Sequence, residues 1–271
     1  MMSDLIARKE SYTPGYTDNA VQFMLRRTAA RDAWFLLPHL RPGMDLLDLG
    51  CGPGTITVDL AKAVSPGWTM GVDIEPGQLQ SAEQLGTRRA IQSLRFQQAS
   101  IYDLPFPSRS FDVVFAHALF EHLGDPLEAL DQVRRVLRPG GLVALCSPDW
   151  GGNLVAPLPP DVAQAVDFYQ SLQRRNGGQP TIGRALGQLL QATGFVDVKL
   201  APFYESYEPV STITEFIAQR LEQETGLGAS LGTMVQALRD WARTPGAFYA
   251  QSWVSAMARV RRERYAGRYE G

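Results

Sequence analysis

The sequence predicts an α/β fold: a Rossmann-like, doubly wound and mostly parallel seven-stranded sheet with helices on both faces and helical cap insertions. Three observations lead to this prediction. Short apolar runs alternate with helical patterns over the first 150 residues, a glycine-rich turn follows the first run, and an acidic residue ends the second. Strands that alternate with helices at this interval build parallel sheets.

The elements of this core follow in a regular order along the chain. A helix over 18–37 comes first, because Val21, Met24 and Leu25 mark one face and Pro38 follows the last turn. The expected strands are 44–49, 68–72, 94–98, 111–116 and 142–146, and the expected helices between them are 55–64, 76–86 and 126–137.

The helix over 126–137 has the clearest start and stop signals. Asp125 is suited to cap it, Pro126 to occupy its first position, and Glu128 completes a capping box. The run Arg138-Pro139-Gly140-Gly141 is expected to stop it before the next strand.

The later chain is less regular. The Gly- and Pro-rich stretch 150–160 is expected to loop out of the sheet, and an alternating strand is expected over 195–200. Helices are expected over 161–175, 182–193 and 211–243, followed by a final strand over 248–260. No linker is evident, so residues 1–271 are interpreted as a single domain. Its parts are an N-terminal helical cap (1–40), a cofactor-binding core (41–150), and substrate-side insertions with the final strands (151–271).

The amino-acid composition excludes several classes of protein. With 45% hydrophobic residues the chain can bury a core, which excludes disordered and disulfide-stapled classes. The net charge of −2 argues against a nucleic-acid partner, and the solvated 259–268 end carries acids beside its arginines. Met1–Tyr12 lacks the apolar region of a signal peptide, and no apolar run is long enough to span a membrane. Two unclustered cysteines indicate a reducing, cytoplasmic setting and no metal site.

The chemistry is expected at the turn 46–54, where the first strand meets its helix. A dinucleotide fingerprint would place its third glycine at position 55, which is Thr55, so the spacing does not suit a pyrophosphate. Asp73, at the end of the second strand, is suited to accept both hydroxyls of a ribose. The alternatives are an ordinary tight turn and a solvated acid.

Together these residues resemble the class I S-adenosylmethionine-dependent methyltransferases. The matching segments follow in the family's order: Leu47–Gly54, Val72–Ile74, Leu104–Phe106 with Ser110–Val114, Phe120–Leu123 and Val136–Gly141. The likeness covers about residues 40–150 and is closest to the branch that contains ubiquinone and menaquinone biosynthesis enzymes. It implies S-adenosylmethionine as cofactor and a small, mostly apolar acceptor methylated on O, N or C.

The resemblance also implies the cofactor contacts. Gly50 and Gly52 would lie against the methionine part, with Asp48 near its ammonium group and Asp73 on the ribose. Ile74 would pack on adenine, and Gln78 would contact ribose or adenine. Ser100 stands where many relatives have an acid, and the Ile101 amide would reach the adenine ring. Further expected contacts are Ala116, at the end of the fourth strand, and Arg27, which would bind the cofactor carboxylate. The alternative for Arg27 is a solvated arginine on an amphipathic cap.

The three histidines limit the search for a base. His117 is interpreted as a base or substrate-orienting group, or as a structural hydrogen-bonding residue. His122 is expected to support the pocket, and His39 to be structural. The aromatic residues Trp150, Phe168, Tyr169, Phe203, Tyr204 and Tyr207 are candidates for the pocket wall, with ordinary core as the alternative.

Other functions remain open from the sequence alone. They are an NAD-linked oxidoreductase, a non-catalytic cofactor-binding protein of the same fold, and an RNA methyltransferase. Oligomeric state is not indicated by any feature of the sequence.

Overall fold

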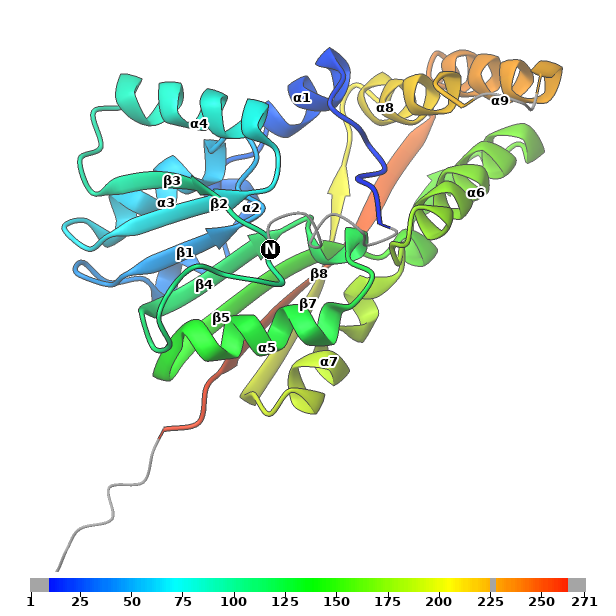
Figure 1. The fold of residues 1–271 in the computed structure, drawn as a ribbon. Coiled ribbons are helices and arrows are strands. Elements are labelled where there is room, and N and C mark those ends of the chain that lie inside the picture. Colours follow the sequence, from blue (N-terminus) through cyan, green and yellow to red (C-terminus); the bar gives the residue numbers. More distant parts are fainter. Residues whose placement is uncertain (1–9, 225–227, 263–271) are drawn as a thin grey trace, which may run out of the picture.

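The computed structural model describes residues 10–224 and 228–262 (Figure 1). The expectation for a leader falls mostly on residues 1–9, and that for a solvated arginine-containing end falls mostly on 263–271. Both therefore lie largely outside the described residues.

Within the described residues, eight strands form one mixed sheet in the order β3-β2-β1-β4-β5-β8-β6, and β7 pairs with β8. The strands are β1 Leu46–Leu49, β2 Thr69–Asp73, β3 Leu94–Gln98, β4 Phe111–His117, β5 Leu137–Pro148, β6 Leu154–Ala156, β7 Val196–Ser206 and β8 Phe248–Arg259. Strands β1 to β5 are parallel, and β8 is antiparallel to its partners. The order reverses between β1 and β4, which opens a crevice at their carboxyl ends.

Helices cover both faces of the sheet, as Figure 1 shows. The helices α2 Ala29–Asp32 and α3 Thr55–Val64 lie in one apolar cluster with β1, β4 and β5, and α4 Pro76–Arg88 continues this layer over β3. The helices α5 Pro126–Val136 and α7 Leu186–Ala192 pack on the opposite face. The predicted doubly wound α/β fold is confirmed.

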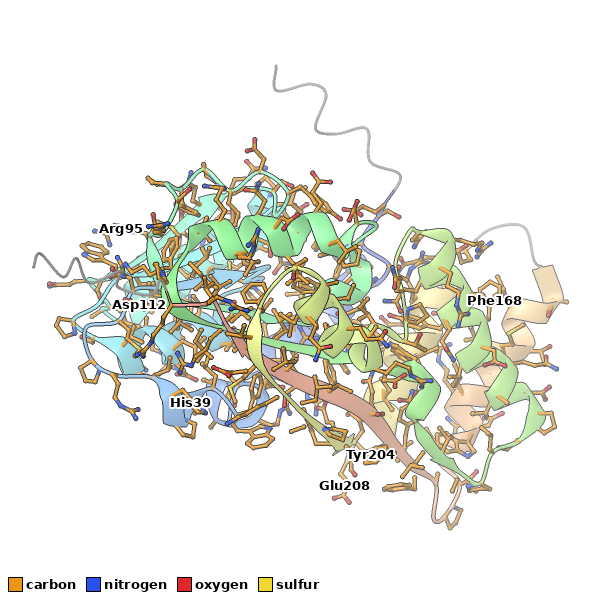
Figure 2. The ribbon with its side chains drawn as sticks, turned by 90° about the horizontal axis from the view of Figure 1, so that it is seen from below. His39, Arg95, Asp112, Phe168, Tyr204 and Glu208 are labelled. Atoms are coloured by element: carbon orange, nitrogen blue, oxygen red, sulfur yellow. The ribbon has the colours of Figure 1, made fainter. Side chains whose placement is uncertain are left out.

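A second apolar cluster forms a cap beyond the carboxyl ends of the strands. It joins α6 Pro160–Arg175, α8 Ser211–Glu222 and α9 Gly228–Trp241 to the start of β8. The helix α1 Asp18–Leu25 meets this cap through Phe23, whose ring stacks on Phe216 with centroids 4.4 Å apart. Figure 2 shows Phe168 on the cap helix α6, far from His39 and Asp112 at the other end of the sheet.

Residues 10–16 run between the core and the cap, and we call them the strap. The Glu10 carboxylate accepts hydrogen bonds from the Tyr102 hydroxyl (2.9 Å) and the Gly124 amide on the core side. On the cap side Thr13 accepts from Asn176 Nδ2 (3.1 Å) and, through its carbonyl, from Arg220 Nε. The strap is therefore tied to the core through Glu10 and to the cap through Thr13.

Three predictions about secondary structure are wrong. The helix expected over 211–243 is interrupted, since α8 ends at Glu222, residues 223–224 are not helical, and α9 begins at Gly228. The helix expected over 18–37 is broken, because Thr28 adopts an extended conformation and its hydroxyl caps α2 by accepting from the Arg31 amide. The segment 150–160 does not leave the sheet entirely, since Leu154–Ala156 pairs with the start of β8 and makes the eighth strand.

Smaller differences concern element boundaries. The turn expected at Arg138–Gly141 is included in β5, with a register shift opposite Phe111 and Val113. A 3₁₀ turn over Ile182–Ala185 precedes α7. The Asp125 cap is confirmed, since its side chain accepts from the Glu128 amide at 3.0 Å. Among the described residues, every helix is too short or too polar to cross a membrane.

Candidate active site

A large cavity opens at the carboxyl ends of β1, β2 and β4, and we call it the cofactor cavity. Its empty volume is about 1190 Å³, part of which is open to solvent. All but one of the predicted site residues line it. They are Arg27, Asp48, Gly50, Gly52, Asp73, Ile74, Gln78, Ser100, Ile101, His117 and His122.

Ala116 is the exception. It is buried in the apolar cluster beneath α5, while its neighbours Phe115 and His117 line the cavity. Successive residues of a strand point to opposite faces, so Ala116 faces away from the cavity that His117 borders. A side-chain contact of Ala116 with a cofactor is not supported.

The glycine turn forms the floor of the cavity. Gly50, Gly52 and Gly54 all have positive φ angles, +64°, +52° and +79°, which other residues rarely adopt. A Cβ atom at Gly52 would meet only Met24 Sδ (3.7 Å) and Gln78 Oε1 (4.0 Å), both lining groups, whereas one at Gly54 would lie 2.9 Å from Ala82 Cβ. Gly52 therefore borders ligand space, and Gly54 permits helix packing.

This difference predicts distinct outcomes for two alanine substitutions. Gly52→Ala should cost about 1–2 kcal/mol of stability through its strained φ. It should also weaken cofactor binding at least about tenfold, since the methyl group enters the cavity. Gly54→Ala should lower the melting temperature more, because it also forces α3 and α4 apart. Thermal melts with and without S-adenosylhomocysteine measure the loss of stability and the loss of ligand binding. If the two variants lost the same melting temperature and the same ligand-induced shift, the separate roles of Gly52 and Gly54 would be contradicted.

Asp73 links the glycine turn to the end of β2. Its carboxylate accepts hydrogen bonds from the Gly52 amide (2.8 Å) and the Glu75 amide (3.0 Å). Burial raises its pKa, which these amide bonds partly offset. The carboxylate is thus fixed at the cavity wall with acceptor capacity left for ligand hydroxyls.

Asp48 lies deeper, only 3% exposed, and accepts a hydrogen bond from the Thr57 hydroxyl at 2.6 Å. Burial raises its pKa from 3.8 to about 7; the Thr57 bond opposes the shift, and the nearby Asp73 adds to it. Because only the Thr57 hydroxyl stabilises its charged form, this buried carboxyl is suited to pair with a cationic ligand group.

The raised pKa of Asp48 predicts a pH-dependent stability. The folded state binds more protons than the unfolded chain between pH 3.8 and about 7, so this carboxyl destabilises the ligand-free protein as pH rises through that window. Asp48→Asn should therefore gain stability relative to wild type at pH 8, on the order of a few kcal/mol, and gain little at pH 4. Urea unfolding at both pH values tests this, and a gain that does not change with pH would contradict it.

The part of the cavity formed by Ile74, Gln78 and residues 100–101 combines apolar and polar groups. Ile74 is 65% exposed at its rim, and Ile101 is buried at its wall. The Ser100 hydroxyl accepts from the Tyr102 amide at 3.2 Å. Gln78 is buried, and its Oε1 atom has no hydrogen-bond partner among the described residues, which suits a ligand donor.

His117 is held between two side chains at the end of β4. Its ring stacks on Trp253 with centroids 4.9 Å apart, and Nε2 lies 3.8 Å from Asp32 Oδ1. Burial, with help from Arg27 and Arg31, lowers its pKa well below the usual value. The ring is therefore neutral at physiological pH.

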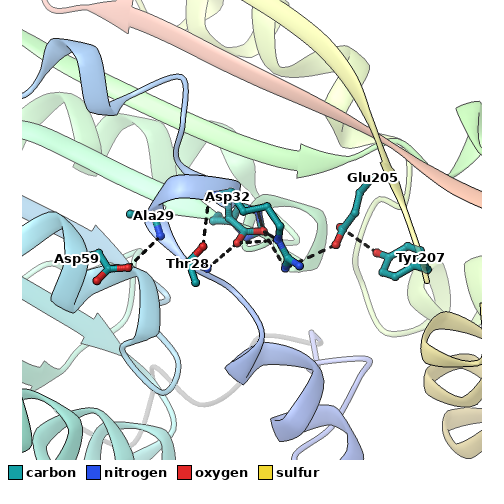
Figure 3. A network of polar contacts seen from close by, with 8 residues as sticks. Thr28, Ala29, Asp32, Asp59, Glu205 and Tyr207 are labelled. Atoms are coloured by element: carbon teal, nitrogen blue, oxygen red, sulfur yellow. Dashed lines mark hydrogen bonds and ion pairs between the residues drawn. The ribbon is translucent and has the colours of Figure 1, made fainter. Parts of the chain in front are cut away.

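A polar network supports this region from outside the cavity (Figure 3). Asp32 accepts from the Thr28 amide (2.7 Å), and Arg31 bridges Asp32 to Glu205 at 3.3 and 3.6 Å. The Tyr207 hydroxyl contacts Glu205 (3.0 Å) and Gln251 (2.7 Å). The network joins the α2 segment to β7 and β8, the strands that carry the cap.

A second cavity, which we call the inner cavity, meets the first beneath the cap. Its empty volume of about 460 Å³ includes space that is open to solvent. The two share five lining residues, which are Tyr12, Met24, Arg27, Ala118 and His122. Ala118 adopts φ +52°, an uncommon conformation for alanine that recurs at functional sites. The strap contributes Tyr12, whose ring meets His122 edge-on at 4.7 Å.

Six of the sixteen residues that line the inner cavity are Phe, Tyr or Trp. They are Tyr12, Phe23, Trp150, Tyr169, Phe216 and Trp253. Of the aromatic residues predicted for the wall, Trp150 and Tyr169 are present, whereas Phe168, Phe203, Tyr204 and Tyr207 are absent from the lining. Tyr204 is 52% exposed, and Tyr207 is used in the polar network.

Glu121 is a functional candidate that the sequence analysis did not select. It is 3% exposed, lines the inner cavity, and lies 3.7 Å from His122 Nε2 through Oε1. Burial raises its pKa to about 7, which Arg27 and the nearby Ser147 hydroxyl oppose. Burial and Arg27 lower the pKa of His122 to about 3. The adjacent pair Glu121-His122 is the one feature of the sequence that could have indicated this site, but nothing in the sequence shows that Glu121 is buried.

Arg27 borders both cavities. Its backbone amide donates to the Met24 carbonyl at 3.1 Å, whereas its guanidinium has no hydrogen bond or ion pair with any described residue. Cys51 and Cys146 are free and buried. Within residues 10–224 and 228–262, no cluster of three or more His, Cys, Asp or Glu side chains could hold a metal. The orphaned Gln78 oxygen, the open glycine turn and the fixed Asp73 carboxylate together fit an adenosine-containing cofactor.

Comparisons with known proteins agree with this geometry. Residues 40–194 match the family model described as methyltransferase domain. A probable methyltransferase, ltbC of Aspergillus luteorubrus, is 39% identical over 49% of this chain and 50% of its own length. The demethylmenaquinone methyltransferase of Lactococcus lactis is 30% identical over 58% of this chain and 68% of its own length.

The fold also matches a solved structure. A phosphoethanolamine N-methyltransferase 2 of Haemonchus contortus, in complex with phosphomonomethylethanolamine and S-adenosylhomocysteine, aligns with a TM-score of 0.62 at 17% identity. That alignment covers 92% of this chain and 58% of the other. The chain spans about half the length of the first curated relative it matches. Because the family model covers more than half of the chain, this protein belongs to the methyltransferase domain family.

Proposed function

We propose that this protein is an S-adenosylmethionine-dependent methyltransferase that acts on a small, mostly apolar molecule. The observation that carries the proposal is the meeting of two different cavities at Tyr12, Arg27 and His122. One has the glycine turn and Asp73, and six aromatic residues line the other. The near-neutral charge of the chain favours a small molecule over a nucleic acid.

Each cofactor-side residue has a role that its surroundings support. Asp73 would accept the ribose hydroxyls, and Gly50 and Gly52 would let the methionine part approach the main chain. Asp48 would pair with the ammonium group, whose charge would lower the raised carboxyl pKa. Arg27 would bind the carboxylate. When bound, S-adenosylmethionine supplies a methyl group activated by a sulfonium.

The protein then aligns the acceptor and excludes water, which are the effects that accelerate such a transfer. The strap lies across the junction of the two cavities, where it is suited to exclude water. We extend the proposal to one continuous domain over the chain, because the cap clusters with β8 of the same sheet. The two free thiols suit a reducing compartment such as the cytoplasm.

His117 is best interpreted as a positioning residue. It lines the cofactor cavity but not the inner cavity, and it reaches the acceptor side only through the ring of Trp253. His117→Ala should raise the KM for the acceptor several-fold, as the loss of one aromatic stacking pair implies, while kcat and cofactor affinity change little. His117→Phe should restore the KM, and His39→Ala, at the far end of the sheet, should change nothing.

Steady-state kinetics with both substrates and calorimetry with S-adenosylhomocysteine separate these effects. A large fall in kcat that phenylalanine does not restore would show that His117 is a base and contradict the positioning role.

Methyl transfer itself is tested by supplying a metabolite extract and S-adenosylmethionine labelled in its methyl group. The expected result is a labelled small molecule detected by mass spectrometry, together with S-adenosylhomocysteine. The absence of labelled product from extracts that support a known methyltransferase would count against the function.

A further inference from the structure

The inner cavity indicates the chemical class of the acceptor. We propose that the acceptor is an oxygenated phenol, bound among the aromatic rings of the inner cavity with its hydroxyl donating to Glu121, which receives the proton during transfer. This inference rests on the methyl-transfer function proposed above and deepens it.

The shape of the cavity favours a planar ring. Phe23 stacks on Phe216 (4.4 Å), and Trp150 lies 4.7 Å from Tyr169, so these walls present ring faces and edges. Trp253, which also lines the cavity, is fixed by its stack on His117. Aromatic ligands gain from both stacked and edge-on contacts in such surroundings.

The polar atoms of the cavity specify hydrogen-bond donors on the ligand. Glu121 Oε2 and Gln173 Oε1 are buried acceptors without a hydrogen-bond partner among the described residues. The Ser147 hydroxyl near Glu121 lowers the pKa of that carboxyl, but its oxygen atom is likewise unpartnered. His122 Nδ1 is also buried and unpartnered, and it accepts or donates according to the ring tautomer. Gln173 is oriented by its Nε2 atom, which donates to the Glu121 carbonyl at 3.0 Å. A buried acceptor without a donor costs free energy, so a ligand that brings a hydroxyl group relieves that cost.

One further polar atom of a lining residue calls for an acceptor on the ligand. Trp253 Nε1 is a buried donor on β8 and likewise has no partner among the described residues. A ligand oxygen placed there would accept its hydrogen. A hydroxyl for Glu121 and a second oxygen for Trp253 together describe an oxygenated phenol.

An amine is the main competing acceptor, since aromatic rings and a carboxylate also suit an ammonium. Arg27 lines the same cavity, and in the ligand-free protein its charge disfavours a second cation there. An ammonium also has no lone pair with which to attack a methyl group. Phenol is neutral when it binds.

The charged and titratable groups around Glu121 agree with proton transfer to it. Those that interact with it electrostatically or lie beside it are Tyr12 of the strap, Arg27, His122, Cys146 of β5 and Tyr169 of α6. Four of the five are neutral near pH 7, because burial raises the pKa of the tyrosines and the thiol and lowers that of His122. The Glu121 carboxyl, with a pKa of about 7, is therefore suited to exchange a proton near neutral pH.

The step balances in atoms and charge. The phenol O–H bond breaks, its proton passes to the Glu121 carboxylate, and the oxygen lone pair forms the new bond to the methyl carbon. The bond from that carbon to sulfur breaks, and its electron pair stays on sulfur. Glu121 then releases the proton to solvent, so one proton is produced for each methyl ether formed.

Binding of matched two-ring probes to the full chain without cofactor tests the assignment. Fluorescence titration should show 2-naphthol binding about tenfold more tightly than naphthalene, and 2-naphthylmethylamine should bind no better than naphthalene. The second oxygen of 7-methoxy-2-naphthol should tighten binding further, and Trp253→Phe should abolish that gain. Equal affinity for 2-naphthol and naphthalene, or tightest binding of the amine, would overturn the proposal.

Two Glu121 variants separate recognition from proton transfer. Glu121→Gln keeps an acceptor oxygen, so it should retain most of the preference for 2-naphthol but lose about 100-fold or more in the rate of naphthol methylation. Glu121→Leu should lose the preference itself. Asp131→Asn, which removes a surface carboxylate from α5, should match wild type in both measurements. Retention of the full rate by Glu121→Gln would overturn the role of Glu121.

Failure of this inference can be distinguished from failure of the proposed function. Stabilisation by S-adenosylhomocysteine in every variant reports an intact fold and cofactor site. A labelled product that is an amine or carbon-methylated molecule would preserve methyl transfer and refute the phenol.

Discussion

Replacing Asp73 by asparagine should weaken the binding of S-adenosylhomocysteine about 10- to 100-fold. Both carboxylate oxygens already accept backbone amides, from Gly52 and Glu75, so their remaining lone pairs are aimed at the cavity. Hydrogen bonds to a charged group contribute about 1.5–3 kcal/mol, and 1.4 kcal/mol corresponds to a factor of ten. Asparagine would turn an NH₂ group toward one of these donors.

A matched control lies two residues away. Glu75 does not line either cavity and caps α4 by accepting from the Gly77 amide at 3.4 Å, which glutamine can also do. Glu75→Gln should therefore bind S-adenosylhomocysteine as wild type does. Calorimetric titration gives both dissociation constants, and melting temperatures show whether the loop is intact. An unchanged dissociation constant for Asp73→Asn would remove the ribose role from this residue.

Replacing Arg27 by methionine should also have a large effect, and a selective one. The guanidinium borders both cavities without a described partner, so it is available to a ligand carboxylate. Loss of a charge-assisted contact of this kind should weaken S-adenosylhomocysteine binding about tenfold or more. Methylthioadenosine, which lacks the amino acid part, should bind the variant and wild type equally.

The neighbouring Arg26 supplies the control. Its guanidinium lies over the rings of Phe23 and Tyr207 and does not line either cavity, so Arg26→Met should keep both affinities. If Arg27→Met weakened both ligands to the same extent, the damage would be general, and Arg27 would not be the carboxylate-binding group.

Features specified by neighbouring residues were predictable from the sequence. The glycine turn and Asp73 lie at the ends of adjacent strands, and parallel pairing of β1 with β2 brings them together. The same holds for the Asp125 cap of α5. Each of these features depends on residues close together in the sequence. The only long-range contact they need is the pairing of parallel strands, which the predicted sheet already provides.

Features made by distant segments were not predictable. The inner cavity combines Tyr12, Glu121, Tyr169 and Trp253 from four separate parts of the chain, and their hydrophobic spacing is the same as that of ordinary core. The break at Thr28 depends on one hydroxyl that competes with the helical pattern. Strand β6 exists because β8 extends past β5 and offers it free backbone groups.

Ligand-induced stabilisation tests the identity of the cofactor most directly. S-adenosylhomocysteine at about 100 times its dissociation constant should stabilise the full chain by about 2.7 kcal/mol, a rise in melting temperature of roughly 5–10 °C. NAD should leave the melting temperature unchanged, because Thr55 replaces the glycine that a dinucleotide turn requires. Stabilisation by NAD with no response to S-adenosylhomocysteine would contradict the proposed methyltransferase function.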